Sequence, residues 1–257
     1  MHICFIEDTP LHGGTQIWVT EAAKNFRDHG EEITLLAPER SWMAAQLADT
    51  NVRVVTYDWD DVVNEDERHQ KIWTTALRDC DVAICTVHPP RHGFHCSVFA
   101  ARCIKQGELK THLIPKTGTI VPEYKREYYL PDDTIRSSVI TIAEFTRQYL
   151  IDTYRIRAEK IAMIYQGTDV RRFTPTTEGR AESHIRYPLP ENAAPILGSV
   201  GSFEHRKGHP ILFEALSRLI SGPLPEAHLM LVGDGPDEEK LMEMVLSMGI
   251  DNHVSFS

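Results

Sequence analysis

The chain has 257 residues, of which 42% are hydrophobic and 25% are charged, as in an ordinary globular protein. Its 27 Lys and Arg residues are outnumbered by 37 Asp and Glu residues, so the formal net charge is −10 at pH 7. An acidic surface repels phosphodiester backbones and anionic lipid. We therefore expect no nucleic acid among the main partners.

The sequence also indicates in which cellular compartment the protein lies. No stretch approaches the roughly 20 apolar residues of a spanning helix, and the amino terminus carries no positively charged leader, so we expect no transmembrane segment. The cysteines are odd in number and show no CxxC spacing, which is typical of reduced thiols. They are Cys4, Cys80, Cys85, Cys96 and Cys103. Both features predict a cytoplasmic protein.

Strands and helices alternate along the first part of the chain. Residues 2–7 form an apolar run that ends at a glycine-bearing loop, and residues 16–30 have helical spacing and close on Gly30 as a C-cap. Each predicted strand is apolar almost throughout, which is expected when helices cover both faces of a parallel sheet, so the class is α/β. Further helices are predicted at residues 97–105 and 144–154, and further strands at residues 32–38, 51–58, 81–90, 111–118, 137–143 and 160–167.

A change of amino-acid composition divides the chain into two parts. Residues 176–195 are rich in proline, charged and small residues and are interpreted as a linker between a domain at residues 1–175 and a second one at residues 196–257. In the second domain, strands are predicted at 196–203, 228–234 and 253–257, and helices at 211–220 and 237–249. The chain stops in mid-sheet, so we expect this second domain to be incomplete.

Ligands of a parallel sheet bind at the carboxyl ends of its strands. The loops at these ends are therefore where function is expected. They read EDTPLHGGT, TVHPPRHG, PKTGT, YQGTD, GSFEHRKG and GDGP.

Three segments resemble the family 4 (group 1) glycosyltransferases, which are retaining nucleotide-sugar enzymes of the GT-B fold. The first is HGGTQIWVTEAAKNFRDHGEEITLLAP after the opening strand, and the second is VITIAEFTRQYLIDTYRIRAEKIAMIYQGTDVRRFTP. The third joins LGSVGSFEHRKGHPILFEALSRL to LMLVGDGPDEEKLMEMVLSMGIDNHVSF. The resemblance implies two Rossmann-like, doubly wound parallel-sheet domains with a cleft between them.

The resemblance places the donor diphosphate at GSFEHRKG. It implies that Lys207 faces the diphosphate, and that Gly201 and Gly208 let the backbone approach it. The arginine that the family usually has directly after the first glycine is replaced by Ser202, and Arg206 is a candidate for the second positive charge. Isolated from this motif, Arg206 and Lys207 would instead be interpreted as solvated loop charges.

The first domain contributes four candidate residues. Gly13 and Gly14 precede a helix, where paired glycines permit φ > 0 and close approach to a ligand, although a tight turn alone would also favour them. By the resemblance, His88 is a polar residue facing the sugar, and Lys116 stands near the position where many members have a histidine that touches the donor sugar.

Two further candidates lie in GDGP. The resemblance gives Asp234 and Gly235 a place facing the nucleotide, but a strand-to-helix turn would favour the same residues. His88, His92 and His95 could form a metal site, yet prolines interrupt the stretch and no carboxylate or cysteine stands at helical spacing, so no metal and no cofactor is expected.

The predicted function is transfer of a sugar, with retention, from a nucleotide-sugar to an acceptor hydroxyl of unknown identity on a glycan, a lipid or a small molecule. Two alternatives stay open: a truncated, non-catalytic binding protein, and a nucleotide-sugar epimerase or hydrolase on the same fold. In the family, two glutamates separated by seven residues hold the donor's sugar and ribose. This chain ends before that point, so we expect little or no transfer by these 257 residues.

Overall fold

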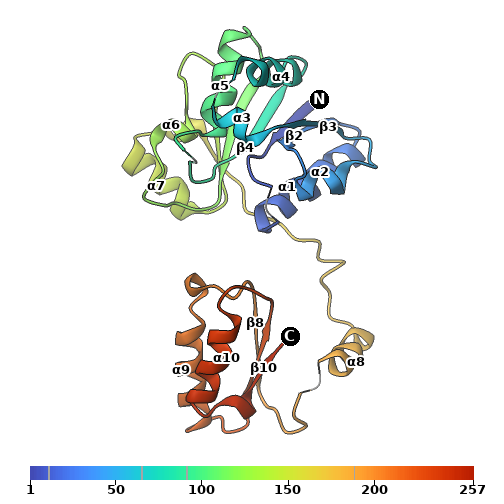
Figure 1. Ribbon diagram of the computed structural model, residues 1–257, viewed down its shortest axis with the longest axis vertical. Helices are drawn as coiled ribbons and strands as arrows, with labels where there is room; N and C mark the ends of the chain where they lie inside the picture. The colour runs from blue at the N-terminus through green and yellow to red at the C-terminus, as the bar shows by residue number, and fades with distance from the viewer. Residues whose placement is uncertain (11, 65, 91, 188) are drawn as a thin grey trace. The chain divides into compact units, whose positions relative to one another are not determined.

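The chain folds into two compact units, Met1–Gly167 and Thr168–Ser257. The computed structural model describes residues 1–257 except 11, 65, 91 and 188, and it describes the backbone but not the side chains of 180, 181 and 183–185. Each unit contains its own parallel sheet (Figure 1), so the predicted α/β class with two sheets is confirmed. The division falls after Gly167, whereas the sequence analysis placed the end of the first domain at residue 175.

Seven strands form the sheet of the first unit, in the order β3-β2-β1-β4-β5-β6-β7. All neighbours run parallel. The chain therefore passes from one side of β1 to the other between β3 and β4. The strands are β1 His2–Ile6, β2 Glu32–Pro38, β3 Arg53–Tyr57, β4 Val82–Thr86, β5 His112–Thr117, β6 Val139–Thr141 and β7 Ile161–Met163.

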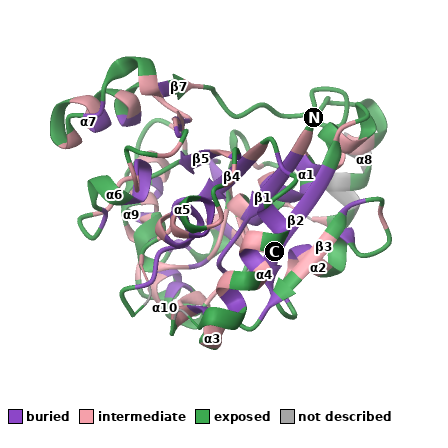
Figure 2. Cartoon of the chain, turned by 90° about the horizontal axis from the view of Figure 1, so that it is seen from above, coloured by how far each residue is buried: buried purple, intermediate pink, exposed green. Residues whose placement is uncertain are grey.

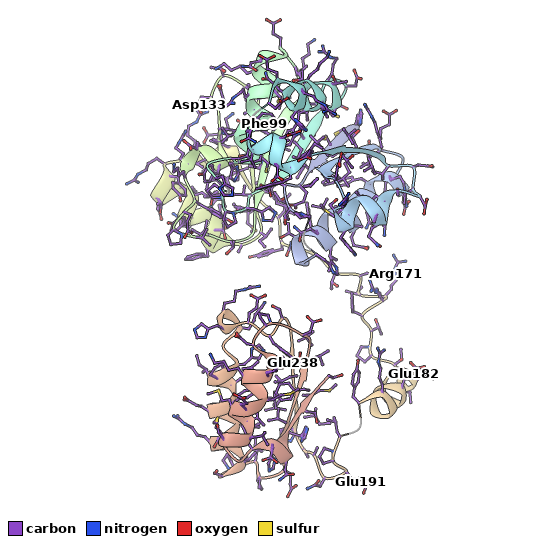
Figure 3. All side chains as sticks on the ribbon, viewed as in Figure 1. Phe99, Asp133, Arg171, Glu182, Glu191 and Glu238 are labelled. Carbon is purple, nitrogen blue, oxygen red and sulfur yellow. The ribbon has the colours of Figure 1, made fainter. Side chains whose placement is uncertain are left out.

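Helices cover both faces of this sheet, and alternate residues of each strand supply the two cores. Ile3 and Phe5 of β1 pack with α1 (Gly14–Asp28) and α2 (Trp42–Leu47). Cys4 and Ile6 point to the opposite face, toward α3 (Trp59–Val63), α4 (Glu67–Leu77) and α5 (Cys96–Gln106). Phe99 of α5 lies in this second core, where Figure 3 labels it. The central strands are accordingly among the most buried parts of the chain (Figure 2).

Two helices complete the first unit beside β5, β6 and β7. They are α6 (Arg126–Tyr129) and α7 (Glu144–Tyr154), and they share a core with Val139 and Ile161. The bounds of α7 agree with the prediction for residues 144–154, and Gly30 after α1 has the positive φ of 86° expected of a C-cap glycine.

The sequence pattern did not predict the short and polar helices α2, α3, α4 and α6. A signal for α4 was present, because Asp66 caps its amino terminus by accepting a hydrogen bond from the Arg68 amide at 2.6 Å. The buried residues His69, Trp73 and Ala76 recur at the spacing of one helical face.

The second unit has the strand order β10-β9-β8, which matches β3-β2-β1 of the first. Its elements are α8 Thr177–Arg186, β8 Ile196–Val200, α9 His209–Ile220, β9 His228–Val232, α10 Glu238–Ser247 and β10 Val254–Phe256. The strands share one core with α9 and α10. Helix α8 lies within the predicted linker, and Figure 3 labels Glu182 on it.

None of the helices in the described part of the chain has the length and apolar character needed to cross a membrane.

Candidate functional site

The carboxyl ends of β1 and β4 meet at the point where the strand order of the first unit reverses. Such a switch point is where open α/β sheets bind their ligands. Glu7 follows β1 directly and His88 follows β4, and the two strands pair in register, with Ile6 beside Cys85. The topology thus brings Glu7 and His88 together.

Glu7 lies at the centre of this group and is fully buried. Its Oε2 atom accepts a hydrogen bond of 2.6 Å from the Thr86 hydroxyl, and its Oε1 atom accepts one of 3.1 Å from the Asp8 amide. The Nε2 atom of His88 lies 2.6 Å from Oε1, near enough for an ion pair when the imidazole is protonated. A buried carboxylate requires such partners, because desolvation without them is costly.

Residues around the pair hold the backbone. Tyr57 donates a hydrogen bond of 2.8 Å to the Glu7 carbonyl. The Nε2 atom of His95 donates one of 3.1 Å to the His88 carbonyl, since a carbonyl can only accept. The His95 ring stacks on Tyr128 at 4.0 Å. Burial lowers the pKa of His95 to about 4, so this imidazole is neutral at physiological pH.

Lys116 is the third candidate at this edge of the sheet. It lies in β5, is 5% exposed, and its ammonium stands 4.0 Å from the centroid of the Trp18 ring. Burial lowers the pKa of Lys116 to about 8, and the charge of Glu7 partly offsets that shift. The sequence pattern placed Glu7 within the loop EDTPLHGGT without selecting it and did not select Trp18, and the structure adds both residues to the candidate group.

The glycine pair before α1 does not behave as predicted. Gly13 has φ −166° and ψ −178°, which is extended backbone, and Gly14 is the first residue of the helix. The expectation of φ > 0 was therefore wrong, because an extended residue suffices to begin this helix. A Cβ atom on Gly14 would meet nothing within 4 Å, so the space at this helix terminus is open.

The three histidines do not form the metal site that was considered as an alternative, since His95 Nε2 contacts the His88 carbonyl. Among the described residues, ligand atoms of Glu7, Asp8 and His88 lie within 4.8 Å of one another. However, Glu7 and His88 are in direct contact at 2.6 Å. Ligands of one metal ion, each bonded at about 2.0–2.2 Å, stand roughly 3 Å or more apart. The Glu7 and His88 atoms are therefore closer together in this structure than two ligands of one zinc ion would be.

In the second unit, the candidate residues surround the loop between β8 and α9. Gly208 has φ 72°, a left-handed conformation that favours glycine, and its carbonyl accepts the first hydrogen bonds of α9 from Ile211 and Leu212. Lys207 extends past Gly201, where an added Cβ atom would lie 3.9 Å from the lysine Nζ atom. A cation, a helix amino terminus and two glycines thus lie at one loop, which suits an anionic ligand.

Arg206 is oriented differently from Lys207. Its Nε atom lies 2.5 Å from Glu204 Oε2, and 68% of the side chain is exposed. The hydrogen bond from Arg206 lowers the pKa of Glu204, so the two form an ion pair at the protein surface. Lys207 is therefore the better-placed cation beside Gly201.

Backbone hydrogen bonds hold the GDGP loop, which follows β9, against the loop that follows β8. The Phe203 amide donates to the Asp234 carbonyl at 2.7 Å, and the Asp237 amide donates to the Phe203 carbonyl at 3.0 Å. Gly235 has φ 158°, and a Cβ atom there would stand 2.5 Å from the Phe203 carbonyl oxygen. The structure thus gives Gly235 a packing role, while the Asp234 side chain is exposed.

Comparison with known proteins finds a family match in the second unit. Residues 181–257, which include this loop, match the family model for glycosyl transferases group 1. The chain is 34% identical over 91 residues to a GDP-mannose-dependent alpha-(1-6)-phosphatidylinositol monomannoside mannosyltransferase of Mycolicibacterium smegmatis, covering 35% of this chain and 23% of the relative. It is 26% identical over 146 residues to the lipopolysaccharide core biosynthesis glycosyltransferase LpsE of Rhizobium meliloti, covering 56% of this chain and 41% of the relative.

Solved structures give the fold. The Anabaena protein Alr3699/HepE, crystallised in complex with UDP, matches with a TM-score of 0.78 and 18% identity over 100% of this chain and 68% of that chain. The chain spans less than half the length of either curated relative named above. Residues 181–257 thus match the group 1 glycosyltransferases, and the chain has the fold of the solved GT-B glycosyltransferase structures.

Proposed function

We propose that the chain forms part of a retaining glycosyltransferase that moves a sugar from a nucleoside diphosphate to an acceptor hydroxyl. The observation that carries the proposal is the position of Lys207 beside Gly201, before α9, in residues that match the group 1 family. One relative is GDP-mannose-dependent and one structural neighbour was crystallised with UDP, which supports a nucleotide-sugar donor without selecting the base.

The chemistry requires a group that stabilises the leaving diphosphate. As the glycosidic bond breaks, negative charge develops on the phosphate oxygens, and a fixed cation and helix amino terminus stabilise that charge. Lys207 and the first turn of α9 supply both. Arg206 would add a second charge only if a ligand displaced Glu204 from it.

In the first unit, we propose that His88 contacts the sugar hydroxyls and that Lys116 helps to shape the same surface. Both stand at the carboxyl ends of neighbouring strands, β4 and β5. With the acceptor hydroxyl as the nucleophile and the departing diphosphate taking its proton, the enzyme would need no dedicated base, and the product would keep the anomeric configuration. Proton NMR of the anomeric coupling in the product tests retention.

We also propose that the reaction needs no metal and takes place in the cytoplasm. Lys207 supplies the charge that a divalent cation would otherwise provide. The five cysteines are free and buried, which supports a reducing compartment.

Calorimetry with UDP, GDP and ADP tests donor binding. We expect Lys207→Ala to weaken binding of the preferred nucleotide by about 1.5–3 kcal/mol, since hydrogen bonds to charged groups contribute about that much. Lys240→Ala is the matched control, because Lys240 is an exposed lysine on α10 of the same unit. A chelator should leave the affinity unchanged. Equal affinity in the Lys207→Ala variant, or loss of binding with chelator, would contradict the proposal.

A further inference from the structure

A cavity of about 340 Å³ lies at the edge of the first sheet, between β3 and α4. Its volume is at the lower end of the range of small-molecule sites. Both elements contribute to its lining, which consists of Arg53, Val55, Arg68, Lys71, Ile72, Thr75 and Ala76.

Two periodicities of the sequence bring these side chains together. On α4, the other lining residues follow Arg68 at intervals of three, four, seven and eight positions, which places them on one face of the helix. On β3, Arg53 and Val55 are two positions apart and therefore point to the same face of the sheet. Val55 and Ile72 are partly buried against the core, so the cavity has an apolar base.

Three exposed cations surround this base, namely Arg53, Arg68 and Lys71. Within the described part of the chain, none of these three side chains forms an ion pair or a hydrogen bond. Glu67, four positions before Lys71, lines the adjoining groove and not this cavity. Acidic residues outnumber basic ones in the chain as a whole, so a cavity lined by three cations and no carboxylate is a local reversal of charge.

This lining has the chemistry of a phosphate site. Like charges around one cavity repel each other, and a bound anion removes that repulsion. The planar guanidinium groups of two arginines match phosphate oxygens through paired hydrogen bonds, and the lysine adds a point charge. A phosphate monoester carries a charge of about −1.5 to −2 at pH 7, which balances three cations better than the single charge of a carboxylate. The Thr75 hydroxyl adds a neutral donor.

The cavity is separate from the candidate site in the same unit. In the strand order, β2 and β1 stand between β3 and β4, which is three strand spacings or roughly 14 Å. Arg53 also opens β3 at its amino end, whereas His88 and Lys116 lie toward the carboxyl ends of β4 and β5. The cavity therefore does not extend the candidate site.

We propose that this cavity binds the phosphate group of a small molecule, with Arg53, Arg68 and Lys71 as its cationic ligands and the apolar base beneath the rest of the molecule. The formal net charge of −10 opposes attachment to an anionic membrane surface, which favours a free ligand. The proposal is independent of the proposed function, because it involves none of the residues assigned to the nucleotide-sugar.

The test is backbone amide NMR of the whole labelled chain during titration with inorganic phosphate and with pyrophosphate, at constant ionic strength set by sodium chloride. We expect the amide signals of Arg53, Lys71 and Thr75 to shift to saturation. These signals belong to the first unit, so they report separately from those of the loop around Lys207 in the second unit.

Substitutions of exposed arginines identify the ligands. Arg53→Gln and Arg68→Gln should each weaken binding about two- to fivefold, the range of exposed charge pairs, and the double variant should weaken it roughly tenfold. Arg78→Gln is the matched control, because Arg78 is exposed and follows α4 but lies outside the cavity lining. It should bind both anions like the wild type.

Three results would overturn the proposal and leave the proposed function standing. The first is shifts that grow linearly with anion concentration or are matched by sodium chloride alone. The second is equal weakening in Arg78→Gln and Arg53→Gln, because that shows diffuse attraction to the helix. The third is sedimentation with phosphatidylglycerol vesicles, lost in the double variant, without saturable shifts by either free anion, because that identifies a membrane surface as the ligand.

Discussion

Substitution of Gly235 by alanine tests the backbone packing that shapes the loop around Lys207. A Cβ atom at position 235 would lie 2.5 Å from the Phe203 carbonyl oxygen and 2.6 Å from the Phe203 amide nitrogen. Ordinary contacts begin near 3.4 Å, so one of the two backbones must move by most of an ångström. The φ of 158° is also rare for residues with a side chain.

The expected cost follows from these two effects. Overpacking costs about 1–3 kcal/mol and a strained backbone conformation about 1–3 kcal/mol, and partial relaxation makes the two less than additive. We therefore expect Gly235→Ala to destabilise the second unit by about 2–4 kcal/mol. The hydrogen bonds that join Phe203 to Asp234 and Asp237 should be the first to weaken.

Hydrogen exchange of the β9 amides measures this loss in the second unit alone. A change of about 2–4 kcal/mol accelerates exchange roughly 30- to 700-fold, because each 1.4 kcal/mol is a factor of ten. Gly198→Ala is the matched control: Gly198 lies in β8, where an added Cβ would meet nothing within 4 Å. Exchange in Gly235→Ala within threefold of the wild type would refute the reasoning.

Three further predictions concern charge. Lys207→Ala should reduce nucleoside diphosphate affinity roughly tenfold or more, as measured by calorimetry. The pKa of His95 is lowered to about 4, so between about pH 6.5 and pH 4 the unfolded chain binds a proton that the folded chain does not. The free energy of unfolding should therefore fall by about 3 kcal/mol over this range. Denaturant titrations should show a smaller loss in His95→Gln. The pKa of Lys116 is lowered to about 8, so its contribution should make the protein more stable as the pH rises from about 8 to 10.5, and Lys116→Met should remove that rise.

The sequence predicted those features that depend on local pattern. Continuous apolar runs mark the strands of both sheets, and the prediction of residues 32–38 agrees with β2 because charged or polar residues stand at its borders. Gly30 has the positive φ that is typical of a glycine at a helix end. These are decided within a few residues, so periodicity and turn chemistry suffice.

The contacts between distant residues could not be predicted in the same way. Thr86 and Glu7 are 79 positions apart, and their contact depends on β1 pairing with β4. An apolar run does not show which strand is its neighbour, so the sequence analysis chose His88 without its partner Glu7. The ion pair of Arg206 with Glu204 shows another limit of prediction. The sequence does not show whether a charged side chain faces a ligand or pairs with a neighbouring charge.

The most direct test of the central claim is a titration of the labelled chain with UDP, GDP and ADP, followed by backbone amide NMR. We expect one of these nucleotides to shift the signals of Gly201, Lys207 and Gly208, and we expect Lys207→Ala, but not Lys240→Ala, to weaken the response. If millimolar concentrations of all three nucleotides leave those signals unchanged, or shift only signals away from this loop, the loop is not a diphosphate site and the proposed function is wrong.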